Sequence, residues 1–175
     1  MSAVVADPQR AATRVRGLRA NSLAAVMILL IEYGLGIWVS LYGHLPGADH
    51  GANIATGFAW AVSKGPVGLS IHALLGIILI VTATTAIIRA VLVRRPVLVG
   101  TASVGLAAIV VAAISGANFV GNGSDGASVS MAVAAGVAIG SYALILFLSG
   151  SATRTWPAWT QTGGGATGSC PPQSA

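Results

Sequence analysis

Four long apolar segments dominate the sequence and limit the folds that it can adopt. They cover residues 23–45, 67–88, 97–120 and 127–148. A helix of about 20 residues crosses the roughly 30 Å hydrocarbon core of a bilayer. None of the segments alternates apolar and polar residues, which excludes a membrane β-barrel, and only 7% of the chain is charged. The sequence therefore predicts an all-α integral membrane protein, a bundle of four transmembrane helices.

The placement of the basic residues predicts the orientation of the bundle. Of the nine basic residues, only Lys64 falls on the side of Asp49 and Asp125. The other eight flank the opposite ends of the segments: Arg10, Arg14, Arg16, Arg19, Arg89, Arg94, Arg95 and Arg154. Such asymmetry follows the positive-inside rule, so we expect a plasma-membrane protein with both termini in the cytoplasm. The net charge of +5 then reflects topology and a lipid bilayer as partner, with no nucleic acid.

The chain divides into three parts. Residues 1–21 form a basic cytoplasmic segment, 22–150 the transmembrane domain, and 151–175 a tail. The tail is rich in Gly, Ser, Thr and Pro, a composition typical of disorder. Its Cys170 is the single cysteine of the chain, so no internal disulfide can form.

The first outer loop carries a short apolar pattern. Ile54, Phe58, Ala61 and Val62 are spaced i, i+4, i+7 and i+8. This spacing predicts a short amphipathic helix on the outer membrane surface. An irregular lid over the bundle is the alternative interpretation.

One glutamate interrupts the first apolar segment. A charged side chain in mid-bilayer costs at least ~2.5–3.5 kcal/mol, so Glu32 must be protonated or paired with a protonated partner. His72 is the only histidine, lysine, arginine or acidic residue in the other three segments. Helical rise places the two Cα atoms within roughly 7 Å of the same depth. We therefore predict an intramembrane polar pair, which either orients two helices or serves a proton relay or a substrate.

The sequence gives little support for a cofactor site or a metal site. His72 lies one helical turn before Gly76, and this arrangement resembles the haem-ligating helices of membrane b-type cytochromes. Ligation by two histidines needs a second intramembrane histidine, which only a dimer would supply. His44, Asp49 and His50 match no fixed metal-ligand spacing and lie in a Gly-rich loop. We expect no cofactor and no metal, with haem binding through His72 as a weaker alternative.

Small residues at a spacing of four mark the faces on which helices can pack closely. Such residues let two helix backbones approach each other in a membrane. The sequence does not decide whether these faces meet within one chain or between two. The predicted packing residues are Gly36, Gly76, Ala108, Ala112, Gly116, Ala132, Gly136 and Gly140.

Four stretches carry a resemblance to known proteins. They are GIWVSLYGHLPGADH at 36–50, SIHALLGIIL at 70–79, SGANFVGNGSD at 115–125 and SMAVAAGVA at 130–138. In these stretches the chain resembles a set of small four-helix integral membrane proteins of actinobacteria. The resemblance implies the fold and the topology, and it implies no activity.

Two classes of function remain open. The first is a non-enzymatic accessory or assembly protein whose small-residue faces dock on other membrane proteins or on a second copy of the chain. The second is a small oligomeric transporter or proton-coupled carrier that uses Glu32 and His72. An enzyme is the least favoured class, because no nucleophile–base pair and no complete metal site is present in the sequence.

Overall fold

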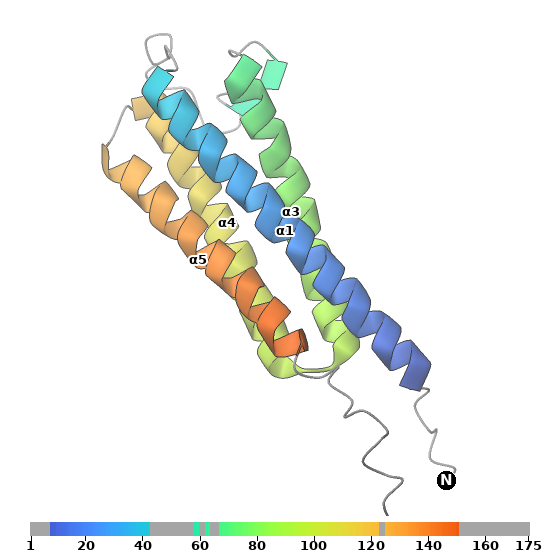
Figure 1. Ribbon diagram of the computed structural model, residues 1–175. Helices are drawn as coiled ribbons and strands as arrows, with labels where there is room; N and C mark the ends of the chain where they lie inside the picture. Colours follow the sequence, from blue (N-terminus) through green and yellow to red (C-terminus); the bar gives the residue numbers. More distant parts are fainter. Residues whose placement is uncertain (1–7, 43–57, 60–61, 64–66, 123–124, 151–175) are drawn as a thin grey trace, which may run out of the picture.

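Four long helices make up nearly all of the structure (Figure 1). This computed structural model describes residues 8–42, 58–59, 62–63, 67–122 and 125–150. Within these residues there is no β-strand. The helices are α1 (Pro8–Tyr42), α3 (Val67–Val93), α4 (Pro96–Asn122) and α5 (Asp125–Gly150).

All four helices are long and apolar enough to cross a membrane. The predicted four-helix transmembrane bundle is therefore confirmed. The first helix is longer than its apolar segment, because it begins at Pro8 and not near residue 22. Pro8 fits the first turn of a helix, and the Ala and Arg residues that follow it favour helix. Residues 8–21 of the basic segment and the first span thus form one continuous helix.

The helices form a ring in chain order. Each helix packs against two neighbours, so that α1 contacts α3 and α5, and α4 contacts the same two helices. Successive helices run in opposite directions (Figure 1). The contact between α4 and α5 is the most extensive of the four. One end of the bundle therefore gathers the start of α1, the turn between α3 and α4, and the end of α5.

Small side chains fill the interior of the bundle, and large ones cover its outside. Tyr142, Leu18 and Ile145 are the largest of the fully buried apolar side chains among the described residues. Most of the buried apolar residues are alanines: Ala25, Ala73, Ala83, Ala86, Ala90, Ala102, Ala108, Ala134 and Ala138. Valine, leucine and isoleucine dominate the exposed surface. This distribution suits a membrane, where lipid accepts large apolar groups and helices associate through small residues.

A tight turn joins α3 to α4. Arg94 has a φ of 59°, in the left-handed region that commonly ends a helix. Its backbone N–H donates to the carbonyl of Val91 at 3.0 Å. Pro96 then starts α4, where its missing N–H costs no hydrogen bond. Two residues are therefore enough to reverse the chain.

Polar side chains inside the spans mostly bond to the backbone. The hydroxyls of Thr82, Thr84, Thr85, Thr101 and Ser141 each donate to the carbonyl four residues earlier, at 2.8 Å. Such bonds satisfy a hydroxyl where no water is present. A bond between helices runs from Nδ2 of Asn21 to the carbonyl of Thr82, at 2.9 Å. It fixes the height of α1 against α3.

Several predictions lie outside the described residues. These include the 151–175 tail with Cys170 and the loop residues His44, Asp49 and His50. Of the predicted surface helix only 58–59 and 62–63 are described, and they are helical. Within them, the hydroxyl of Ser63 donates to the carbonyl of Ala59 at 2.7 Å. The choice between a surface helix and a lid stays open.

Candidate functional site

A carboxyl and an imidazole meet between the first two spans. Glu32 lies on α1 and is buried, and His72 lies on α3 with 29% of its side chain exposed. Nδ1 of His72 is in direct contact with Oε2 of Glu32. Oε1 of Glu32 is buried and has no hydrogen-bond partner among the described residues. The pair predicted from the sequence is thus in direct contact.

This pair can hold one proton without a net charge. The two forms are a neutral carboxylic acid beside a neutral imidazole, and a carboxylate beside an imidazolium. Loss or gain of a proton leaves one unit of charge, which is costly within a bilayer. The arrangement therefore either ties α1 to α3 or passes a single proton.

Two glycines near the pair have different surroundings. Gly36 follows Glu32 by one helical turn, and a Cβ atom there would lie 3.9 Å from Cε1 of His72. This distance is an ordinary van der Waals contact, so an alanine would also fit beside the imidazole. Gly76 follows His72 by one turn, and a Cβ atom there would meet nothing within 4 Å. Gly36 thus belongs to the α1–α3 contact, whereas Gly76 faces open space within the described chain.

The predicted packing residues of α4 face α5. Ala108 is buried, and Ala112 and Gly116 are partly buried. A Cβ atom at Gly116 would lie 3.3 Å from Sδ of Met131 on α5. Nearby, the hydroxyls of Ser115 and Ser130 share a hydrogen bond of 3.0 Å between the same two helices.

The predicted packing residues of α5 face outward. Ala132, Gly136 and Gly140 are exposed, and a Cβ atom at either glycine would meet nothing within 4 Å. They form one stripe along the helix, because residues four apart lie on the same face. We call these three residues the α5 stripe. None of the other described helices lies within 4 Å of a Cβ atom built at either glycine of the α5 stripe.

A contact that the sequence analysis missed closes the α4–α5 interface. Tyr142 is fully buried, and its ring lies against Gly105, where a Cβ atom would come within 2.9 Å of Cε2 and Cζ. The Tyr142 hydroxyl has no hydrogen-bond partner among the described residues. Gly105 precedes Ala108 and Ala112 by three and seven residues, so it extends the small-residue face of α4. This spacing of small residues along α4 was the feature of the sequence from which the contact at Gly105 could have been predicted.

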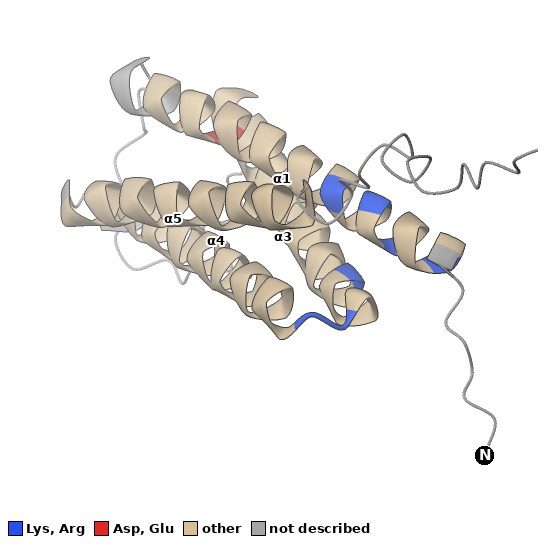
Figure 2. Ribbon diagram, turned by 60° about the horizontal axis from the view of Figure 1, so that its bottom comes forward, with Lys and Arg blue, Asp and Glu red and all other residues tan. Residues whose placement is uncertain are grey.

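Arginines gather at the end of the bundle where α1 begins (Figure 2). Nη1 of Arg14 donates to the carbonyl of Leu92 at 3.2 Å, near the carboxyl end of α3. The guanidinium of Arg89 lies over Gly17, and a Cβ atom at Gly150 would lie 3.8 Å from Nη2 of Arg19. Cations are favourable at carboxyl ends of helices, where carbonyls lack partners. These arginines therefore help to hold the bundle together.

No described group of three or more His, Cys, Asp or Glu residues is arranged to hold a metal ion.

Comparison with models of protein families, with curated proteins and with solved structures gave no match to this chain. The resemblance to small actinobacterial membrane proteins stays a prediction. Four apolar helices define the class: this chain is a multi-pass membrane protein.

Proposed function

We propose that this chain is a non-enzymatic accessory or assembly protein of the plasma membrane, which docks on a transmembrane helix of a partner. The observation that carries the proposal is the outward position of the α5 stripe. Small residues permit close approach of another backbone, where dispersion and Cα–H contacts hold the two helices. The occupant is a helix of another membrane protein or α5 of a second copy.

A photo-crosslinking experiment in intact cells tests this proposal. A benzoylphenylalanine residue at Val133, an exposed position beside the α5 stripe, should give one discrete crosslinked product. The same residue at Val81, an exposed position of α3, should give none. A product of twice the 17.4 kDa chain mass identifies a second copy. Replacement of Gly140 by leucine should remove the product, because the larger side chain prevents close approach. Absence of a discrete product at Val133 contradicts the proposal.

A second candidate function is a small oligomeric, proton-coupled carrier. The contact between Glu32 and His72 favours it. Ionisable residues within membrane spans are rare and commonly belong to ion, proton or substrate pathways. In this mechanism the pair takes up one proton on one side of the membrane and releases it on the other. The interior of one copy is packed with small side chains, so a solute path requires more than one copy of the chain.

Both candidate functions assume that the two termini lie in the cytoplasm. Single cysteines at Ser124 and Ser151, in a Cys170→Ser background, should react differently with a membrane-impermeant maleimide. We expect labelling of intact cells at position 124 only, because the arginines flank the other side. Labelling at position 151 in sealed cells reverses the orientation. Labelling at both positions after permeabilisation controls for reactivity.

A further inference from the structure

The two oxygens of the Glu32 carboxyl have different surroundings, which bears on where the pair holds its proton. Oε2 contacts Nδ1 of His72, while Oε1 is buried and has no hydrogen-bond partner among the described residues. The Glu32 side chain as a whole is 8% exposed. A carboxylate spreads its charge over both oxygens and has about four lone-pair sites, so both oxygens need donors. A carboxylic acid needs fewer donors, because it is neutral and its own O–H donates.

The helices that pack against the pair bring no second donor from their described residues. α1 contacts α3 and α5, and α3 also contacts α4, which has no ionisable residue. The Tyr142 hydroxyl of α5 is itself without a partner, so it does not bond to Oε1. Asp125 begins α5, and a negative charge would favour the protonated form of Glu32. Arg89 of α3 lies 17 residues beyond His72, about 26 Å along the helix.

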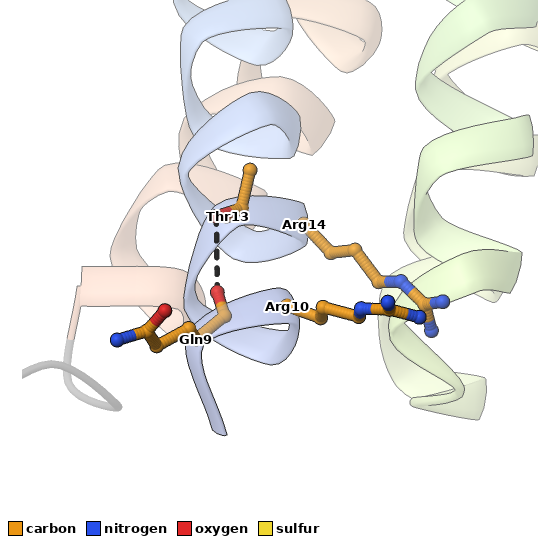
Figure 3. A pocket seen from close by; sticks show the side chains of 4 residues that line it. All are labelled: Gln9, Arg10, Thr13 and Arg14. Atoms are coloured by element: carbon orange, nitrogen blue, oxygen red, sulfur yellow. Dashed lines mark hydrogen bonds between the residues drawn. The ribbon is translucent and has the colours of Figure 1, made fainter. Parts of the chain in front are cut away.

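The arginines of α1 that could stabilise a carboxylate lie near the start of the helix. Figure 3 shows the side chains of Arg10 and Arg14 extending from the first two turns of α1. The described arginine nearest to Glu32 along α1 is Arg19, and 13 residues, or about 20 Å of helix, separate the two. Coulomb attraction falls with distance, so Arg19 contributes far less than a direct contact would. Tyr33, the next residue after Glu32, is exposed and faces away from the buried carboxyl.

We propose that the pair rests as a neutral carboxylic acid beside a neutral imidazole, with the proton on Oε2 of Glu32. The O–H group donates to the lone pair of Nδ1, and the single N–H of the imidazole lies at Nε2. This form leaves one neutral carbonyl oxygen without a donor. The ionised form leaves a charged oxygen without one, which costs more in a buried site. For the carrier, and resting on that proposed function, the state at rest is then the proton-loaded one.

One isotope label tests this assignment, because Glu32 is the only glutamate of the chain. The full chain is made by cell-free synthesis with glutamate labelled with ¹³C at Cδ, reconstituted in phosphatidylcholine bilayers and measured by solid-state NMR. We expect the Cδ resonance at the position of a carboxylic acid from about pH 5 to pH 8. With ¹⁵N-labelled histidine, the His72 ring, assigned by its loss in His72→Leu, should be neutral and protonated at Nε2.

A second labelled glutamate in the same sample provides the matched control. Ala11 is exposed near the start of α1 and lies outside the apolar segment. The carboxyl of Ala11→Glu should therefore give a resonance at the carboxylate position near neutral pH. Adding Glu32→Gln should remove the carboxylic acid resonance and leave the carboxylate resonance in place. The two positions are thus resolved and assigned within one protein.

A Glu32 resonance at the carboxylate position near neutral pH overturns the proposal in favour of the ion pair. A resonance that moves from the acid to the carboxylate position between about pH 5 and pH 8 overturns it as well. Proton uptake into liposomes is a separate measurement. An acid resonance without uptake leaves the protonated pair in place and removes the carrier, whereas uptake with a carboxylate resonance does the reverse.

Discussion

Replacement of Gly105 by alanine should lower the free energy of unfolding by about 1–3 kcal/mol, the usual cost of an overpacked interior. The added Cβ atom would lie 2.9 Å from Cε2 and Cζ of Tyr142, which is fully buried. Neither α4 nor the ring can yield without opening the most extensive helix contact of the bundle. Unfolding by SDS titration in mixed micelles measures the loss.

Gly17→Ala is the matched control for this substitution. Its Cβ atom would also collide with a side chain, but the colliding atom is Nη1 of Arg89, the far end of a flexible group. We expect a change well below that of Gly105→Ala. In addition, Tyr142→Leu should make Gly105→Ala nearly harmless, because the obstructing ring is gone. Equal losses at the two glycines, or additive losses in the double variant, contradict this account of the α4–α5 interface.

Removal of either partner of the Glu32–His72 pair should weaken the tie between α1 and α3. Glu32→Leu leaves the imidazole without its partner, and we expect a loss of about 0.6–1.7 kcal/mol, the range of hydrogen bonds within membranes. His72→Leu should cost a similar amount. Glu32→Gln keeps the shape and much of the hydrogen bonding, so its stability should remain close to that of the parent chain. The same SDS titration measures all three.

The double variant Glu32→Leu with His72→Leu tests whether the two side chains interact. Its loss should be smaller than the sum of the two single losses, because each single change leaves one polar group unpaired. Strict additivity means that the two side chains do not interact. Proton uptake into liposomes that contain the Glu32→Gln variant tests the carrier. An uptake present in the parent chain and absent from this stable variant moves the carrier ahead of the accessory protein.

The spans and the polar pair could be predicted from the sequence because each depends on a strong energetic term. A continuous segment of about twenty apolar residues is typical of a membrane span and rare in soluble proteins. A carboxyl group in hydrocarbon requires a partner. His72 was the only candidate, so its contact with Glu32 followed from composition and depth. The start of α1 was harder to predict, because an Arg- and Ala-rich segment forms helix as readily outside the membrane as within it.

The faces of the helices could not be predicted in the same way. In a soluble protein the polar side of a helix marks its exposed face. Lipid is as apolar as the interior of this bundle, so Gly136 on the outside and Gly105 on the inside have similar sequence surroundings. Only the spacing of small residues remained as a signal, and it occurs on both α4 and α5. The structure distinguishes them by placing Tyr142, and not the α5 stripe, against α4.

Because α1 is long, a small tilt at one end would displace its other parts by several ångströms. Its 35 residues form one helix of about 52 Å, and 18 of them, or about 27 Å, separate Arg14 at one end of the bundle from Glu32. A rigid rod that tilts by about 10° around its arginine end displaces a point 27 Å away by about 5 Å. That distance is larger than the reach of an ion pair. Packing against neighbouring helices sets the tilt of a helix in a bundle, so the α1–α3 contact with its bond from Asn21 to Thr82 is what keeps the carboxyl of Glu32 beside the imidazole of His72.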